Sequence, residues 1–217
     1  MTANVSCYYL YHTSLQQVSS YKYLGVNISS NLSWETHIQY ITNNANRSLG
    51  FIKRNFSSVP LSLKLLLYKT LVRSKLKYAS SIWNLGTNVL ISALEAIQNR
   101  SVRFILTNYH RTASVTSMKI SLNLPNLALR RNLNRLCLFH KIYYHNPLLR
   151  DKLLTPPFYI SSRLDHPQKM GIPQCNTTTF YNSFIPQTTV LWNHLPASVA
   201  SISDSIAFKQ CLSSVNC

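Results

Sequence analysis

Hydrophobic residues recur at steps of three and four along residues 34–56, which predicts a helix with one buried face. Seven positions form that face: Trp34, Ile38, Ile41, Ala45, Leu49, Ile52 and Phe56. Ser33 is expected to cap the start of this helix, and Glu35 is favourable beside the positive end of the helix dipole. Lys53 and Arg54 stand at the other end, where the dipole prefers cations.

The segment before this helix has a strand-like pattern. Residues 7–29 alternate imperfectly between apolar and polar side chains and are rich in Tyr, Val and Ile. They predict two short strands in a hairpin, with Ser19 and Ser20 in the turn. Gly25 would allow the backbone or a neighbouring side chain to approach closely.

Further helices are predicted downstream. Pro60 fits the first turn of a mostly buried helix over residues 61–84, and another helix is expected over about 89–107. A short stretch around 115–120 can also be helical. Pro125 precedes a fourth helix over 129–144. On that helix, one face is expected to carry Leu129, Leu133, Leu136 and His140, and a different face is expected to carry Arg131 and Arg135.

The composition changes beyond Pro147. Seven of the nine prolines lie in residues 147–196, where periodicity is weak, so we expect an irregular segment that docks back through Trp192. A last short helix is predicted near 203–212. The predicted fold class is therefore mainly α: a small N-terminal β-hairpin, a helical bundle, a Pro-rich segment and a final helix. The expected domain limits are 1–30, 31–146 and 147–217.

The charge of the chain bears on the kind of partner that it binds. The 217 residues include 22 Lys and Arg but only five Asp and Glu, for a formal net charge of +17. Eight cations lie between Glu35 and Glu95 and nine between Glu95 and Asp151, with no acid in either interval. This distribution indicates a polyanionic partner, with nucleic acid ahead of an anionic membrane. An ordinary solvated face is the alternative.

The candidate binding residues are the cations on the predicted strand and helices. Three of them share a narrow ribbon on the predicted second helix, at i, i+4 and i+8. The nucleic-acid-binding residues that we expect are Lys22, Lys53, Arg54, Lys69, Arg73, Lys77, Arg100, Arg103, Arg131 and Arg135. Thirteen tyrosines could stack on bases, although core packing is their commoner use.

Catalytic and metal-binding patterns are sparse. The five acids are far apart and no DxD or HExxH motif is present, so a site in which carboxylates bind two metal ions is not expected. The P-loop, G-x-S-x-G and G-x-G-x-x-G motifs of nucleotide-binding proteins and hydrolases are also absent from the sequence. Cys137 and His140 could supply half of a zinc site, but without a second pair a structural role is expected. Five scattered cysteines argue against a disulfide framework. With no leader-like start and no apolar run of 18 residues, we expect an intracellular protein, not a secreted one.

A family resemblance appears at residues 21–38. The stretch "YKYLGVNISSNLSWETHI" resembles the segment after the catalytic palm of non-LTR (LINE-type, jockey-like) retrotransposon reverse transcriptases. In that family a KYLG strand closes the palm and a W-x-x-HI helix opens the thumb. The resemblance continues in order to about Leu212, through "LYKTLVRSKLKYASSIWN", "LEAIQNRSVRFIL", "LRRNLNRLCLFHKIYY", "FIPQTTVLWNHLP" and "AFKQCL".

The resemblance implies a C-terminal, thumb-side piece of an RNA-directed DNA polymerase that lacks the catalytic palm and the endonuclease. The family's metal chemistry uses aspartates upstream of KYLG, and this chain has no Asp before Asp151. We therefore expect a chain that is not an enzyme by itself and takes no cofactor, magnesium being expected only for the missing palm.

The implied partner is an RNA/DNA template-primer duplex, bound in the nucleus or cytoplasm, with no membrane partner. The alternative is a non-functional transposon relic or a stand-alone basic interaction module. The sequence leaves the oligomeric state and the element clade open.

Overall fold

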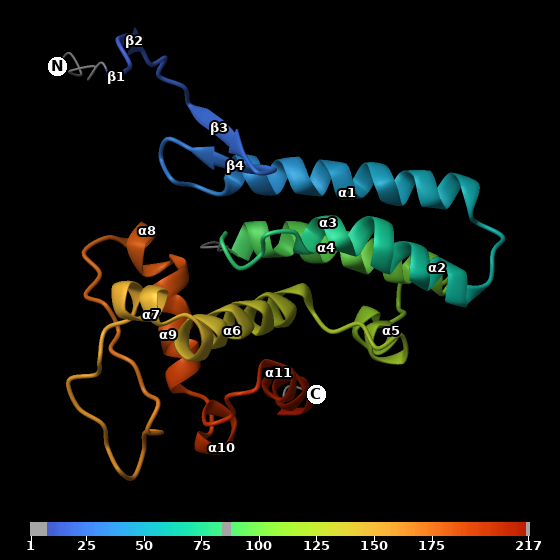
Figure 1. Cartoon of the computed structure of the whole chain (residues 1–217). Helices are drawn as coiled ribbons and strands as arrows, with labels where there is room; N and C mark the ends of the chain where they lie inside the picture. Colours follow the sequence, from blue (N-terminus) through green and yellow to red (C-terminus); the bar gives the residue numbers. More distant parts are fainter. Residues whose placement is uncertain (1–7, 84–87, 216–217) are drawn as a thin grey trace.

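The computed structural model describes residues 8–83 and 88–215 and confirms a mainly α fold. Helix α1 runs along the helices that follow it in the chain, and the C-terminal helices gather around α6 on the opposite side (Figure 1). A small β-structure precedes α1 and extends away from the helical body (Figure 1). Three positions used in the sequence analysis lie outside the described residues: Cys7, Cys217 and Asn84, the last residue of the predicted second helix.

The N-terminal region forms two antiparallel hairpins where one was predicted. Strand β1, Tyr9–Leu10, pairs with β2, Thr13–Ser14, and β3, Ser20–Tyr23, pairs with β4, Val26–Ser29. The predicted turn position is wrong, because Ser20 already opens β3. The two residues of the β3–β4 turn both have positive φ, 45° at Leu24 and 81° at Gly25. Such backbone angles match the right-handed twist of paired strands.

Gly25 also allows the close approach that its sequence position suggested. A Cβ atom there would lie 3.3 Å from Cε1 of Tyr78. The Tyr78 hydroxyl donates a hydrogen bond to the Leu24 carbonyl oxygen, at 2.7 Å. The Asn27 backbone N–H donates to Nδ1 of His37, at 3.3 Å. These contacts fix the β3–β4 hairpin against the helices.

Helix α1, Glu35–Asn55, buries the predicted face. Ile38, Ile41, Ala45, Leu49 and Ile52 are all at most 5% exposed. The predicted Ser33 cap is wrong: Trp34 occupies the N-cap position and makes no side-chain cap bond. The Ser33 backbone N–H instead donates to the Asn31 side chain in the preceding loop, at 3.0 Å.

The second predicted helix is interrupted and shorter than expected. It consists of α2, Leu61–Leu67, the π-helix η1, Tyr68–Val72, and α3, Arg73–Lys77. It ends at Lys77, and Ala79 has a left-handed φ of 51°. The residues buried along it are spaced by four: Lys64, Tyr68, Val72 and Leu76.

The π-helix explains that spacing. Twelve residues of regular α-helix leave the first and last side chains about 120° apart around the axis. The extra residue of a π turn absorbs about 100° of this rotation, so all four positions face one side. Leu63 and Leu71 lie away from this side and are exposed.

These elements and the next two helices enclose the first hydrophobic core. Helix α4, Asn88–Ile105, contributes Leu94, Ile97, Phe104 and other buried residues, and α5, Val115–Ser121, contributes Met118. A buried polar pair lies inside this core. The Tyr68 hydroxyl donates to Oε1 of Gln98 at 2.8 Å, and Nε2 of Gln98 donates to the Pro125 carbonyl at 3.0 Å.

The second core surrounds Trp192. Helix α6, Leu127–His145, supplies Leu136, Phe139 and Ile142 to it. The following helices are α7, Pro147–Leu153; α8, Thr178–Tyr181; α9, Phe184–Asn193; α10, Ala197–Ala200; and α11, Ser205–Val215. Trp192 is fully buried, with its ring centroid 5.2 Å from that of Phe139 and 5.9 Å from that of Phe208.

The predicted docking through Trp192 is therefore confirmed, and so is the last helix. The prediction of an irregular segment over 147–196 holds for residues 154–177, while α7, α8 and α9 interrupt it. The second core also crosses the expected domain limit at 146, because α6 provides one of its walls. The domain limits themselves stay a prediction.

The Tyr68–Gln98 pair gives a test of the first core. Changing Tyr68 to Phe removes the hydroxyl and leaves Oε1 of Gln98 buried without a donor. We expect the free energy of unfolding to fall by about 1–3 kcal/mol, because an unpaired buried acceptor keeps its desolvation cost. Denaturant unfolding of both proteins measures it, and Tyr159→Phe, on an exposed side chain, is the control. Equal stability would show that the bond contributes nothing.

The second core should be sensitive to acid through His140. This ring is fully buried and stacked on Phe208, and Nε2 lies 2.7 Å from the Ile202 carbonyl oxygen, so Nε2 carries the proton. Burial lowers the pKa of His140 below 6.5; His145 lowers it further, whereas the Ile202 bond and Asp204 act in the opposite direction.

In the unfolded chain His140 regains its ordinary pKa, so between the two pKa values the unfolded state binds more protons. The contribution to stability is therefore present above pH 6.5 and lost as the pH falls from there toward the folded pKa. As the pH is lowered from about 8 to about 5, the melting temperature should fall more steeply for the wild type than for His140→Gln. Parallel curves would assign the acid sensitivity to other groups.

Candidate nucleic-acid interface

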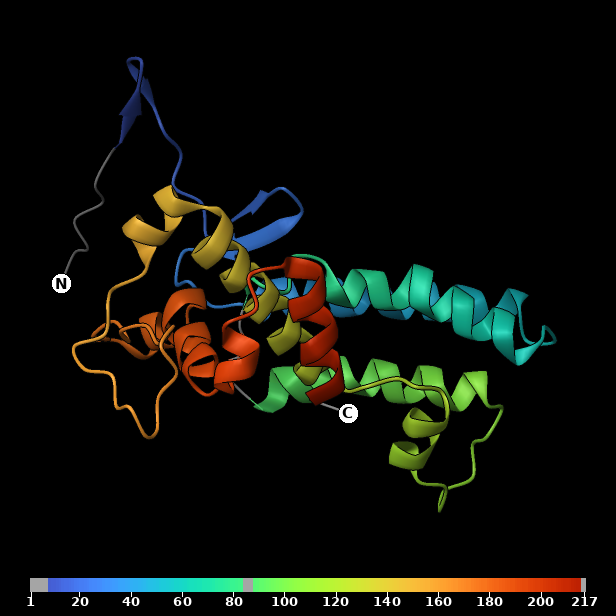
Figure 2. The same ribbon diagram turned by 60° about the horizontal axis from the view of Figure 1, so that its bottom comes forward.

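Cations from three separate elements, α3, α6 and α11, lie close enough to influence one another or the Cys137 thiol between them. We call them the basic cluster: Arg73, Lys77, Arg130, Lys141 and Lys209. Helix α6 packs on α11, which brings Lys209 to α6 across a long stretch of sequence. Figure 2 shows α11 lying across α6 on this side of the molecule.

Electrostatic effects within the basic cluster show that its members are close together. Desolvation lowers the pKa of Lys77, and Arg130, Lys209 and Arg73 lower it further. Desolvation also lowers the pKa of Arg73, with Arg130 adding to the effect. Arg130, Lys209 and Arg73 thus raise the cost of holding a positive charge on Lys77. An anion placed among them would relieve this repulsion.

A groove of about 710 Å³ opens beside these cations, between α6 and α11. Its lining combines two lysines with hydrogen-bonding side chains: Asn134, Lys141, Ser205, Lys209 and Gln210. The Asn134 side chain also donates to the hydroxyl of Ser80 at 3.0 Å, which links the groove to the turn after α3. Such a lining suits a phosphate backbone better than an apolar ligand.

Four of the five acids are engaged elsewhere, and the fifth, Glu35, lies in the first turn of α1. Oε1 of Glu95 accepts from the backbone N–H groups of Leu127 and Ala128, at 2.6 and 3.3 Å, and its Oε2 pairs with Lys119 at 3.0 Å. Asp204 accepts from two backbone N–H groups at the start of α11. The remaining ion pairs among the described residues are Arg150–Asp151 and Lys169–Asp165. None of these ion pairs includes a member of the basic cluster.

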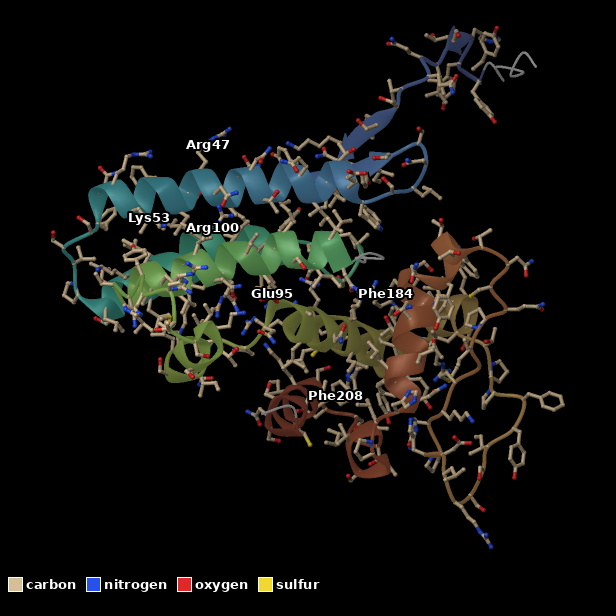
Figure 3. The ribbon with its side chains drawn as sticks, turned by 180° about the vertical axis from the view of Figure 1, so that it is seen from behind. Arg47, Lys53, Glu95, Arg100, Phe184 and Phe208 are labelled. Carbon is tan, nitrogen blue, oxygen red and sulfur yellow. The ribbon has the colours of Figure 1, made fainter. Side chains whose placement is uncertain are left out.

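Two further cations, Lys53 and Arg100, lie between α1 and α4. Desolvation lowers the pKa of Lys53, and the charge of Arg100 lowers it further. Figure 3 shows Lys53 and Arg100 on the sides of α1 and α4 that face each other, while Arg47 projects from the outer side of α1. Arg54 is exposed nearby in the last turn of α1.

The structure spreads the ten predicted residues over several places. Arg73 and Lys77 enter the basic cluster, whereas Lys69 lies half-buried in the π-helix. Lys22 is exposed and its Nζ lies 4.6 Å from the ring centroid of Tyr40. Arg103 donates to the His110 carbonyl at 3.0 Å and so holds the loop after α4.

Arg131 and Arg135 lie on a face of α6 that is buried, although we expected them from the sequence to bind nucleic acid. They are 8% and 3% exposed. Arg131 lies over the ring of Trp83 and Arg135 over that of Phe184, at 5.8 and 5.9 Å from the ring centroids. Burial lowers the pKa of Arg135 to about 10, with Arg131 adding to the effect. These two side chains therefore lie apart from the exposed cations.

Sequence reasoning missed Arg130, Lys141 and Lys209. Arg130 and Lys141 lie on the same helix as two chosen arginines, and the position of the buried face was the information needed to choose between them. Nothing in the spacing along the chain signals Lys209, because it joins the basic cluster only through the packing of α11 on α6.

Other predicted features behave as structural ones. His140 is buried and bonded as described above, and Cys137 lines the groove, where burial raises the pKa of its thiol. Nowhere in residues 8–83 and 88–215 do three or more His, Cys, Asp or Glu side chains gather as a metal site requires. None of the described helices is both long and apolar enough to cross a membrane.

Comparison with known proteins finds a distant relationship to a transposon enzyme. The chain is 26% identical over 148 residues to a protein of Drosophila melanogaster named "Probable RNA-directed DNA polymerase from transposon X-element". The match covers 67% of this chain and 15% of that protein. No family model and no solved structure matches the chain. The similarity supports the resemblance to retrotransposon reverse transcriptases.

The same comparison contradicts the expectation that the chain is not an enzyme, because the protein that it matches is named as a polymerase. That expectation rested on the wide spacing of the five acids and on the absence of any Asp before Asp151, since the resemblance implies catalytic aspartates upstream of KYLG.

Replacing Arg135 should stabilise the protein. Its Nη2 is buried without a hydrogen-bond partner, so folding desolvates a charge that no carboxylate compensates. Arg135→Met keeps a long flexible side chain against Phe184, and we expect a gain of about 1–4 kcal/mol in the free energy of unfolding. Denaturant unfolding measures the gain. The exposed Arg111→Met is the control and should change stability by less than about 0.5 kcal/mol. A loss of stability in Arg135→Met would mean that the guanidinium is needed.

Proposed function

We propose that the chain acts as the nucleic-acid-binding, thumb-side part of a retrotransposon RNA-directed DNA polymerase. Its basic cluster holds the sugar-phosphate backbones of a template-primer duplex. The convergence of cations from α3, α6 and α11, with no carboxylate paired to them among the described residues, is the observation that carries this proposal. The distant relationship to a transposon polymerase supports the choice of nucleic acid over other polyanions.

The contacts would be with phosphates and not with bases. Lys77, Lys141 and Lys209 are exposed, so each can reach a backbone from its helix. Lysine side chains act on phosphates as mobile point charges, which gives affinity without sequence preference. A polymerase must hold every sequence that it copies, so this kind of contact suits the proposed role.

A salt titration tests the proposal. The triple variant Lys77→Gln, Lys141→Gln, Lys209→Gln removes three charges whose side chains make no ion pair within the described residues. For a DNA duplex, the slope of log K against log salt should flatten by about 2–3 units, since each phosphate contact contributes about 0.9. Fluorescence anisotropy with a labelled duplex, repeated with an RNA–DNA hybrid, measures the slopes.

The matched control removes the same charge from other exposed positions, as Arg47→Gln, Arg111→Gln, Lys152→Gln. Its slope should stay near that of the wild type. Equal slopes in the two triple variants would mean that total charge, and not the basic cluster, governs binding. A wild type that binds no duplex even at low salt would overturn the proposal and favour an interaction module or a relic.

A further inference from the structure

The segment between α7 and α8 contains a closed loop, residues 155–171, whose two ends are joined. The Gly171 backbone N–H donates to the Thr155 carbonyl at 2.8 Å, and the Thr155 hydroxyl donates to the Gly171 carbonyl at 3.1 Å. A Cβ atom on Gly171 would lie 2.6 Å from the carbonyl oxygen of Pro156. Only glycine therefore fits this neck without a shift of the backbone.

The inner side of the loop is anchored to the second core. His166 is 3% exposed, and its Nε2 lies 3.0 Å from the Trp192 carbonyl oxygen. The Trp192 indole N–H donates to the Gln168 carbonyl at 2.9 Å, and Met170 and Asn193 exchange two hydrogen bonds. Asp165 pairs with Lys169 at 2.7 Å and accepts from the Ser161 backbone N–H. The loop is thus held in place at its neck and along one side.

The outer side carries large side chains that the chain itself does not cover. Phe158 is fully exposed, and Tyr159 and Leu164 are 69% and 89% exposed. The loop stands away from the helical body in both Figure 1 and Figure 2. Pro156 and Pro157 precede Phe158 directly and restrict the backbone that presents it. The two rings are therefore offered at a low cost in conformational entropy.

Charge indicates which partner these rings meet. The loop's one acid, Asp165, is already engaged by Lys169, so the exposed charge that remains is that of Arg163. The same loop also exposes Ile160 and Leu164, at 40% and 89%, together with Ser162 and Arg163. The net charge of +17 favours an anionic partner over a protein interface for this surface. Exposed rings on the same loop as an exposed cation match the stacking and phosphate contacts that unpaired nucleotides make.

We propose that the outer side of the 155–171 loop binds single-stranded nucleic acid, with bases stacking on Phe158 and Tyr159 and a phosphate beside Arg163. This inference deepens the proposed function and rests on it for the class of partner. It assigns unpaired template, or displaced strand, to a surface separate from the basic cluster. Stacking accepts any base, because every base has a π face.

The experiment compares two probes that carry the same phosphates: a labelled single strand of thymidines and a strand of equal length without bases. Wild type should bind the thymidine strand more tightly than the abasic one. The variant Phe158→Ala, Tyr159→Ala should bind the thymidine strand about 10-fold or more weakly and lose the preference, since each stacked base contributes strongly to affinity. Its affinity for duplex should not change.

Two further variants sharpen the test. Tyr9→Ala, Tyr11→Ala removes two exposed aromatic rings from the distant β1–β2 hairpin and should leave both strands bound as in the wild type. Gly171→Ala keeps the rings but forces the neck apart, and it should weaken thymidine-strand binding while the protein still melts cooperatively.

The outcomes separate the two proposals. Equal thymidine-strand affinity in wild type and the Phe158, Tyr159 variant would overturn the loop assignment, and so would equal binding of the two strands by the wild type or an equal loss in the hairpin control. Failure of duplex binding, by contrast, would overturn the proposed function through the basic cluster. A wild type that binds duplex but no single strand would leave that function standing and remove the loop from it.

Discussion

The carboxylate of Glu95 fixes where α6 leaves the first core, and most of the molecule is arranged around that helix. One carboxylate oxygen accepts hydrogen bonds from two backbone N–H groups in the first turn of α6, and the other pairs with Lys119 of α5. A negative charge at the positive end of a helix is favourable, and partial burial strengthens the effect. Asn126 makes no side-chain cap bond to α6, so this long-range contact takes the place of a local cap.

The position of α6 also determines where the two proposed binding surfaces lie. Its first turns carry Arg130 to α3, and its second half forms the wall against which Trp192 packs. Trp192 in turn holds the inner side of the 155–171 loop through its indole N–H and its carbonyl oxygen. The basic cluster and the 155–171 loop are thus positioned by one helix, although more than 70 residues separate Lys77 from Phe158. Glu95, one of only five acids in the chain, thus sets the position of α6 and, through α6, the positions of both surfaces.

Periodicity was sufficient to predict the helices and the buried face of α1, because regular helices repeat one rule at every turn. It failed where the backbone departs from that rule. The π-helix aligns Lys64, Tyr68, Val72 and Leu76 on one buried side, which a regular helix would not do. On α6, the pattern of leucines gave no sign that Arg131 and Arg135 are buried over aromatic rings. The candidate site was predicted only in part, through Arg73 and Lys77. Lys209 and the closure of the loop at Gly171 depend on contacts between distant segments, which no local pattern encodes.

The π-helix also bears on how this part of the chain can change in length. A π turn is an α-helix with one residue inserted, and it keeps the flanking turns in phase. Loss of a single residue from Tyr68–Val72 would convert η1 to regular α-helix while α2 and α3 kept their faces toward the core. The neighbouring α1 has no such element, so a deletion there would rotate every later side chain by about 100°. Of α1 and the interrupted helix formed by α2, η1 and α3, only the interrupted helix can lose a residue and keep its buried side toward the core.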